Sequence, residues 1–314
     1  MLAEIIITPW HWTAFVVCVL FFLALDLGVF HRKAREVNFK EAMGWTTVWF
    51  ILAMAFALLI HRVHSPEKAT LFVTGYIVEL SLSMDNVFVM ALIFRYFRVP
   101  HQLQHRVLFW GIIGALLMRG VMIYTGSALI KRFDFLLLFF GAFLVYTGVK
   151  MLFADDQGVE PEKNWVLRLA RRFFPVTQEF EGQKFMVSRN GIRALTPLAL
   201  VLLMVETTDL VFALDSIPAI FGITQDPFII FTSNVFAILG LRSLYFVLAG
   251  ALRYFTYLKY GLSLVLVFIG LKMLAKEWIH IQTNVALWIV AGIILLSIAI
   301  SVIMAKLRPS DSDD

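Results

Sequence analysis

Nine apolar stretches, separated by clusters of charged residues, run through the sequence. Each has about the 20 residues that a helix needs to cross a bilayer. The 314-residue chain is 60% hydrophobic and only 16% charged, against about 25% charged residues in ordinary soluble domains. We therefore expect an all-α, polytopic membrane protein with about nine transmembrane helices. The stretches lie at 10–30, 43–62, 70–96, 107–128, 134–153, 196–222, 226–250, 257–276 and 284–306.

Lysine and arginine residues are concentrated on one side of this arrangement. Eighteen of them lie in the alternate connections of one side, whereas the opposite connections carry five. The positive-inside rule assigns the richer side to the cytoplasm, so we expect the N-terminus outside and the C-terminus in the cytoplasm. The excess of 27 Lys+Arg over 22 Asp+Glu is then a topology signal, and we expect no nucleic-acid partner.

Two local features narrow the function classes. The chain has one cysteine, Cys18, which excludes an intrachain disulfide, a CxxC redox pair and a thiolate metal cage. The only extended polar stretch, 154–195, contains WVLRLARRFF, which predicts a short amphipathic helix at the cytoplasmic surface. We interpret this stretch as a cytoplasmic linker between two halves, and a regulatory or lipid-contacting role is the alternative.

Charged landmarks recur in the same order in the two halves. YTGVKML at 146–152 corresponds to FIGLKML at 268–274, and Arg119 in LLMRGVM corresponds to Arg242 in LGLRSLY. Nearer the N-terminus of each half, the aspartate of SMDNVF corresponds to that of ALDSIP. The acid-to-arginine separations are 34 and 27 residues, and the arginine-to-lysine separations are 31 and 30. Similar composition explains matching Leu and Phe residues but not matching charges, so we infer an internal repeat.

The repeat has consequences for topology. Each copy contains three apolar stretches, and an odd number of crossings makes the second copy enter the membrane from the opposite side. Inverted repeats of this kind are common in secondary transporters, with the site near the midplane. We expect two N-terminal helices in 1–69, repeat 1 in 70–153, the linker in 154–195, an inverted repeat 2 in 196–276, and a last helix and tail in 277–314.

Five acidic residues lie inside two otherwise apolar stretches. They are Glu79, Asp85, Glu206, Asp209 and Asp215. At about 2.5 to 3.5 kcal/mol for each central acid, the set would cost roughly 12 to 18 kcal/mol without partners. Two arginines in mid-span, at positions 119 and 242, are the available internal counterions and leave three acids unmatched. Protons or a divalent cation must balance the remainder.

The repeat aligns Glu79 with Asp209 and Asp85 with Asp215. Because the copies are antiparallel, we expect Glu79 to lie level with Asp215, and Asp85 level with Asp209 and Glu206. Carboxylates from both helices are expected to meet around one cation, or around two closely spaced positions. Six residues of straight helix turn through about 600°, so each pair would not share one face. We therefore expect a bend or an unwound turn, which Pro218 would favour in the sixth stretch.

Oxygen donors surround these acids in the sequence. Ser83 and Thr208 add hydroxyls, which with carboxylates suit hard cations such as Mn²⁺, Mg²⁺ or Ca²⁺. Met84 and Met204 could soften a site, but we interpret both as packing residues. Asp26 is interpreted as an interfacial charge paired with nearby basic residues, with direct ligation as the alternative. All seven histidines lie at span edges or in connections, which weakens a haem or zinc interpretation.

Four segments resemble the TerC/Alx family of bacterial inner-membrane proteins, within the LysE transporter superfamily. They are LALDLGVFHRK, ELSLSMDNVFVM, ETTDLVFALDSIPAIF and FAILGLRSLYFVLAG, and the likeness runs from about residue 10 to 280. The resemblance implies two inverted three-helix bundles, tellurium resistance in some members and manganese export in others. It also implies site roles for Asn86 and Ser216 beside the five acids, and does not separate the TerC-like and Alx-like branches.

The sequence therefore predicts an Mn²⁺ exporter of the bacterial cytoplasmic membrane that works by alternating access. Its expected partners are a divalent metal ion and membrane lipids, and H⁺ is the candidate coupling ion. The metal ligands are predicted to be Glu79, Asp85, Asn86, Glu206, Asp209 and Asp215, supported by Ser216, Arg119, Arg242, Asp26, Thr208 and Ser83.

Two other function classes stay open. One is a metal-sensing membrane partner or scaffold in a metal or tellurite stress response, without transport. The other is an intramembrane enzyme in which two aspartates act as acid and base. The sequence has neither HExxH nor a GxGD-type pattern, so we expect no enzyme. No oligomeric state is predicted.

Overall fold

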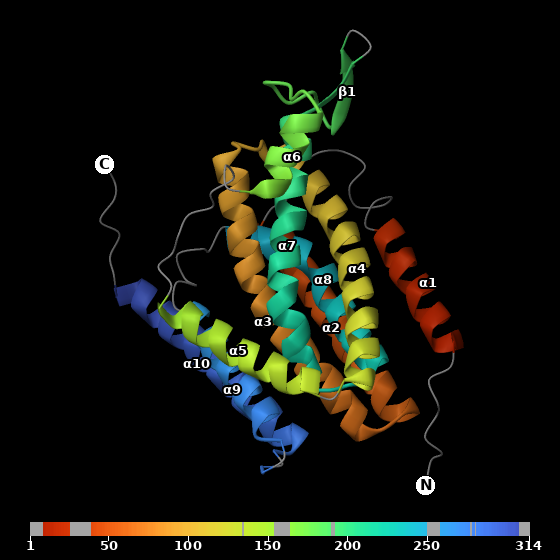
Figure 1. Cartoon of the computed structure of the whole chain (residues 1–314), viewed down its shortest axis with the longest axis vertical. Helices are drawn as coiled ribbons and strands as arrows, with labels where there is room; N and C mark the ends of the chain where they lie inside the picture. Colours follow the sequence, from red (N-terminus) through yellow and green to blue (C-terminus); the bar gives the residue numbers. More distant parts are fainter. Residues whose placement is uncertain are drawn as a thin grey trace.

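A computed structural model of the chain describes residues 9–25, 39–133, 135–153, 164–189, 192–249, 258–276, 278–279 and 281–307. Within this part of the chain there are ten α-helices and one two-stranded antiparallel sheet (Figure 1). The elements are α1 (Pro9–Leu25), α2 (Phe39–Val63), α3 (Pro66–Tyr96), α4 (His101–Arg132), α5 (Phe135–Phe153), α6 (Trp165–Phe173), β1 (Met186–Arg189), β2 (Ile192–Leu195), α7 (Pro197–Phe221), α8 (Pro227–Ala249), α9 (Leu258–Leu274) and α10 (Thr283–Leu307).

Seven of the described helices are long and apolar enough to cross a membrane: α2, α3, α4, α5, α7, α8 and α10. The chain is thus a polytopic membrane protein, and seven of the nine predicted spans correspond to described helices of sufficient length. The two remaining apolar helices, α1 and α9, have 17 residues each. For α1 the predicted stretch continues to residue 30, beyond the described residues.

The fold is all-α as predicted, apart from the short β1–β2 hairpin in the linker, which was not predicted. In its register Arg189 pairs with Ile192, so a two-residue connection joins the strands. The two intervening residues are Asn190 and Gly191, and Asn-Gly is a strong sequence signal for a two-residue hairpin connection. The signal was therefore present within the stretch interpreted only as a linker.

Local capping explains where the central helices begin. Ser65 precedes α3, its hydroxyl accepts a hydrogen bond from the Lys68 amide at 3.2 Å, and Pro66 occupies the first turn. A proline also opens α7 and α8, where the missing N–H leaves no intrahelical bond unmade. Before α8, the Asp226 carboxylate accepts a hydrogen bond from the Phe228 amide at 3.0 Å.

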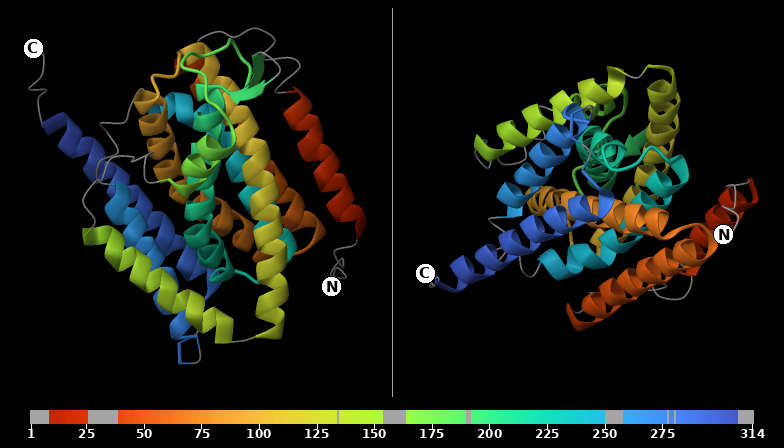
Figure 2. Two further views of the ribbon diagram at one scale, coloured as in Figure 1. Left: turned by 45° about the horizontal axis from the view of Figure 1, so that its top comes forward. Right: turned by 90° about the horizontal axis from the view of Figure 1, so that it is seen from below.

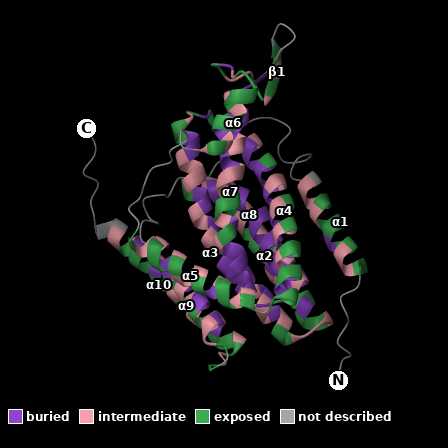
Figure 3. Ribbon diagram, viewed as in Figure 1, coloured by how far each residue is buried: buried purple, intermediate pink, exposed green. Residues whose placement is uncertain are grey.

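Helices α3, α7 and α8 form the centre of the molecule. In the most apolar 18-residue segment of α8, 94% of the residues are buried, against 17% in that of α5. Helix α8 is therefore enclosed by other helices, whereas α5 lies at the periphery. Buried residues are concentrated along α3, α7 and α8, and exposed ones on α1 and α5 (Figure 3). Helices α5, α9 and α10 cross the long helices obliquely, on the flank opposite α1 (Figures 1 and 2).

Close glycine contacts join α5 to α9. A Cβ at Gly141 would lie 3.1 Å from the Gly270 carbonyl oxygen, and one at Gly148 would lie 2.8 Å from the Ser263 carbonyl oxygen. In the repeat, Gly141 corresponds to Ser263 and Gly148 to Gly270, each 122 positions later. Replacing each residue by its equivalent in the other copy therefore turns the Gly141–Gly270 contact into the Ser263–Gly148 contact. The interface is thus symmetric between the two copies. The chain numbering rises along α5 while it falls along α9, so the two helices are antiparallel.

This interface gives a stability prediction. Gly148→Ala is expected to destabilise the protein by about 1–3 kcal/mol, because the added Cβ meets backbone atoms of α9 and forces the helices apart. Gly292→Ala is the matched control, since a Cβ there meets nothing within 4 Å. Both changes gain about 1 kcal/mol of helix propensity. Thermal unfolding in detergent measures the difference, and equal midpoints for the two variants would contradict the packing described.

The predicted amphipathic helix is present as α6, and it packs against α7. Its Leu167 is buried in a hydrophobic cluster with the first turns of α7. The Asn164 side chain caps α6 by accepting from the Val166 and Leu167 amides, and its amide nitrogen lies 3.2 Å from the Met204 sulfur. Helix α6 therefore lies alongside α7 for about two turns.

Candidate functional site

Arg119 of α4 is the centre of a buried polar cluster that joins α3, α4 and α7. Only 1% of its surface is exposed. It donates to both Asp209 oxygens, from Nε at 3.3 Å and from Nη2 at 3.0 Å. Its Nη1 contacts Glu79 and lies 3.4 Å from the Ser216 hydroxyl. The prediction that Arg119 is an internal counterion is confirmed: one guanidinium links an acid of α3 to an acid of α7.

The contacts also follow the crossed order expected of antiparallel helices. The Asn86 side chain donates to Asp209 at 3.2 Å, so the end of the α3 motif meets the start of the α7 motif. Conversely, Glu79 and Ser216 both contact Nη1 of Arg119. Low-numbered positions of one helix thus lie level with high-numbered positions of the other.

A small cavity of about 50 Å³ lies beside Arg119. Three pairs of its lining residues are equivalent in the repeat, each 130 positions apart: Leu82 and Phe212, Asp85 and Asp215, Asn86 and Ser216. The cavity is lined by Glu79, Leu82, Asp85, Asn86, Arg119, Met151, Phe212, Asp215, Ser216 and Leu266. The two halves therefore contribute matching positions to one space.

The expected unwound turn is not found in the described helices α3 and α7. Helix α3 runs through its motif without a break, and α7 continues through Pro218 to Phe221. At 100° per residue, positions 79, 82, 85 and 86 fall within a sector of about 120°, and the equivalent positions of α7 do the same. An unwound turn is not needed, because a cavity of this width can be reached from one broad face of a continuous helix.

Helix α5 contributes residues that sequence reasoning missed. Met151 lines the cavity, and the Thr147 side chain lies within hydrogen-bonding reach of Asp215. Lys150 is near enough for its charge to act on Asp215. Thr147 and Met151 are four residues apart and so share a helix face.

Several predicted site residues lie elsewhere. Glu206 packs against α4, where a Cβ at Gly114 would lie 2.0 Å from its carboxylate oxygen. Its position on α7 is about 60° outside the cavity-facing sector.

Thr208 donates to the Met204 carbonyl at 2.6 Å, as hydroxyls within helices commonly do. The buried Ser83 and Arg242 are not among the cavity-lining residues. Asp26 lies outside the described residues.

The acids do not converge on one point in this conformation. Among the described residues, no group of three or more His, Cys, Asp or Glu side chains is placed to hold a metal ion together. Arg119 lies between Glu79 and Asp209 in this conformation, and convergence of the acids around a bound cation stays a prediction. A cavity needs about 10–15 Å³ for one water, so the adjoining space accommodates a small cation with a few waters.

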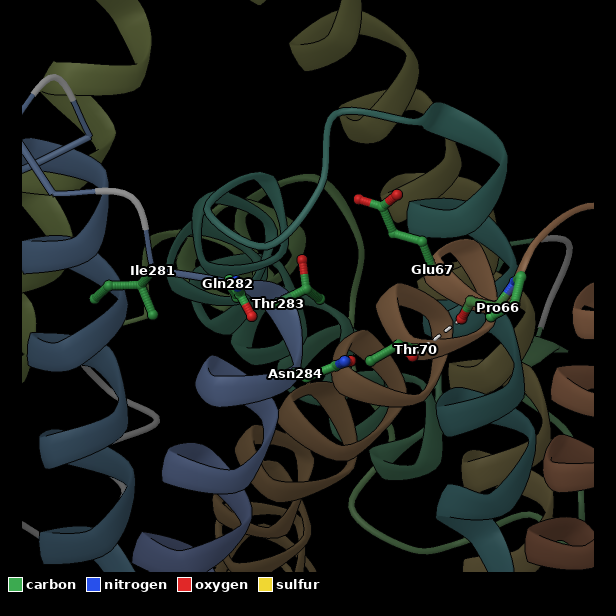
Figure 4. Close-up of a pocket in the computed structure, with 7 residues that line it drawn as sticks. All are labelled: Pro66, Glu67, Thr70, Ile281, Gln282, Thr283 and Asn284. Atoms are coloured by element: carbon green, nitrogen blue, oxygen red, sulfur yellow. Dashed lines mark hydrogen bonds between the residues drawn. The ribbon is translucent and has the colours of Figure 1, made fainter.

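A larger pocket lies at one end of the bundle and is chemically different. It has a volume of about 550 Å³ and is formed where α3 and α10 begin (Figure 4). Its lining comprises Pro66, Glu67, Thr70, Ile281, Gln282, Thr283 and Asn284. Among its described lining residues there is one acid and no lysine, arginine or histidine, so this part of the pocket lacks the paired charges of the cavity beside Arg119.

Comparisons with known proteins agree with these features. The profile of the "Integral membrane protein TerC family" matches residues 64–312. The chain is 49% identical over 307 residues to "Uncharacterized membrane protein STKORF319" of Myxococcus xanthus, covering 98% of this chain and 96% of that protein. It is 45% identical over 305 residues to "Putative membrane-bound redox modulator Alx" of Escherichia coli (strain K12), covering 94% of each. No solved structure matches the chain. The chain is therefore an integral membrane protein of the TerC family and a homologue of Alx.

Proposed function

We propose that this protein transports a divalent cation, most specifically Mn²⁺ out of the cytoplasm, through the cavity beside Arg119. The observation that carries the proposal is the excess of acidic over basic side chains at the cavity, where Glu79 and Asp209 are buried and Asp85 and Asp215 are half-buried. Glu79, Asp85, Asp209 and Asp215 lie at or beside the cavity, and Arg119 is the guanidinium among them. Lys150 is near enough for its charge to act on Asp215, so the described residues here comprise four acids and two cations, a balance that favours a positively charged substrate. Ionisable groups inside a membrane commonly mark ion pathways.

Arg119 supplies a mechanism for holding the acids between transport events. With no cation bound, its single positive charge is shared by Glu79 and Asp209, both of which it contacts. When a divalent cation enters the cavity, Glu79 exchanges Arg119 for the ion, and Asp85 and Asp215 complete the ligand set. Asp209 remains on Arg119 through the two hydrogen bonds from Nε and Nη2. Loading and unloading then leave no acid without a partner.

Alternating access is supported by matching contacts between the two proposed inverted repeats. Equivalent helices meet in the pairs α3–α7, α4–α8 and α5–α9. The glycine contacts of α5 and α9 exchange under the repeat, and equivalent positions of α3 and α7 line one cavity. Rocking of one repeat against the other around such a site would open it to each side in turn.

Orientation and coupling complete the proposal. The excess of basic residues in one set of connections supports an N-terminus outside and a C-terminus in the cytoplasm of a bacterial cytoplasmic membrane. Protons are the proposed coupling ion, because protonation of the acids would lower their charge when the cation leaves. The oxygen-rich lining favours hard divalent cations, and the TerC resemblance favours Mn²⁺ among them.

The name of the Alx relatives refers to redox modulation. This chain has one cysteine, Cys18 on α1, so it cannot form an intrachain disulfide by which a thiol pair would act. We therefore attribute any redox effect to the transported metal rather than to thiol chemistry, and we propose a transporter rather than an enzyme.

The proposal is tested by Mn²⁺ flux into proteoliposomes that contain a manganese-quenched fluorophore. The expected result is a saturable flux that exceeds that of protein-free vesicles. A pH-sensitive dye in parallel vesicles should report proton movement opposite to Mn²⁺. Mn²⁺ binding without flux would replace transport with metal sensing, and neither binding nor flux would contradict both.

A further inference from the structure

Among the described residues that line the cavity, Met151 is the one sulfur donor. Besides carboxylates, an amide, a hydroxyl and the Arg119 guanidinium, the lining has three hydrocarbon side chains, Leu82, Phe212 and Leu266, and the thioether of Met151. The volume is about 50 Å³, so a cation and one or two waters would fill it. An ion in this space lies close to every wall, including the sulfur.

Helix α5 holds Met151 towards the acids. Met151 is one helical turn from Thr147, on the same face, and the Thr147 side chain lies within reach of Asp215. Between them Gly148 brings α5 close to α9, with its Cβ position 2.8 Å from the Ser263 carbonyl oxygen. That contact limits how far α5 can shift, so the face with Met151 stays directed at α7.

A thioether discriminates between cations that carboxylates alone treat alike. Mg²⁺ and Ca²⁺ are hard ions that take oxygen ligands, and replacing one of their waters with sulfur is unfavourable. Softer ions, with Mn²⁺ at the near end and Cd²⁺ further along, tolerate sulfur better. We propose that Met151 is a specificity-determining residue, whose thioether contacts the transported ion and disfavours Mg²⁺ and Ca²⁺. This inference rests on the proposed function and names its substrate class as transition-metal divalent cations.

The repeat provides a contrast between methionines, because Met151 packs against a hydrophobic cluster as the others do but also lines the cavity. Met273 is the equivalent of Met151 in the second copy, 122 positions later. Its sulfur packs against α7, where a Cβ at Gly222 would lie 2.6 Å away, and it does not line the cavity. Met84, only one residue from Asp85, packs against the hydrophobic cluster of α3, α4, α7 and α8. Of these methionines, Met151 alone lines the cavity.

The test compares Met151→Leu with Met273→Leu and Met84→Leu, three substitutions that keep an apolar side chain of similar volume. Proteoliposomes measure Mn²⁺ flux, its inhibition by Mg²⁺ and Ca²⁺, and Cd²⁺ flux. In Met151→Leu, the ratio of Mn²⁺ to Mg²⁺ apparent affinity should fall about tenfold, as substitutions around metal ligands commonly shift affinity 10- to 100-fold. Cd²⁺ transport should fall most, and both control variants should match the unmodified protein.

The outcomes separate the two proposals. Robust Mn²⁺ flux with an unchanged ion ratio in Met151→Leu would overturn this inference and leave the proposed function intact. The same holds if Met273→Leu or Met84→Leu shifts the ratio equally, because the effect would then be general packing. Absence of flux and of Mn²⁺ binding in the unmodified protein would overturn the proposed function and this inference with it.

Discussion

Asp85→Asn and Asp215→Asn are each expected to lower Mn²⁺ flux about 30- to 100-fold. Each replaces a charged oxygen ligand with an amide of the same shape, a loss of about 2–3 kcal/mol of cation binding. The two positions are equivalent in the repeat and line the same cavity, so the two losses should be similar. The measurement is the initial rate of flux over a range of Mn²⁺ concentrations, at equal amounts of reconstituted protein.

Asp226→Asn is the matched control for these variants. Asp226 lies just before α8, near Lys68 at 3.8 Å, and caps the helix through the Phe228 amide. Asparagine caps helices as well as aspartate does, so the fold should be kept. Flux should stay close to that of the unmodified protein. Normal flux in Asp85→Asn and Asp215→Asn would refute the site assignment.

Arg119→Leu should give the largest loss of stability, about 3–5 kcal/mol, because it leaves Glu79 and Asp209 buried without their cation. Arg119→Lys should recover part of this loss, since it keeps the charge but cannot bond both Asp209 oxygens as the planar guanidinium does. Thermal unfolding in detergent measures these differences. Arg132→Leu, an exposed arginine at the end of the same helix, is the control and should change stability little.

A double variant separates charge imbalance from lost packing. If the cost comes from uncompensated charge, Arg119→Leu combined with Asp209→Asn should be more stable than Arg119→Leu alone, since one stranded carboxylate has been removed. Additive losses in the double variant would instead mean that packing dominates. Added Mn²⁺ should stabilise Arg119→Leu, because a divalent cation replaces the missing charge.

The helices were predictable because hydropathy and charge clusters are local signals. Boundaries were less predictable: α4 extends from His101 to Arg132, beyond the expected 107–128. The additional turns at its start include buried polar residues such as Gln104, which bonds Tyr245 at 3.0 Å. A hydropathy profile assigns such residues to loops, because it does not include the hydrogen-bond partner that offsets the cost of burying a polar side chain.

The candidate site was predictable where charged residues recur at equivalent positions of the two halves and must be paired inside the membrane. Arg119 had to meet acids, since an unpaired guanidinium inside a membrane is too costly, and it does meet Glu79 and Asp209. The positions of Glu206 and Arg242 were not fixed by this reasoning. Each needs only some polar surroundings, and helix rotation then decides whether a residue reaches the cavity.

Met151 was missed for a related reason. A methionine in an apolar helix gives no local signal that distinguishes a ligand from a packing residue, and only the approach of α5 to α7 places it against the acids. Such a contact between helices distant in sequence depends on how the two halves pack. The single sequence did not encode it in any pattern of spacing.

The most direct test of the account is to locate Mn²⁺ by its anomalous X-ray scattering in crystals grown with the ion. The account predicts one peak in the cavity, within coordination distance of Glu79, Asp85 and Asp215, with Arg119 moved off Glu79 and still bonded to Asp209. A peak at another place, or crystals saturated with Mn²⁺ in which Arg119 still holds both acids and the cavity shows no peak, would contradict it.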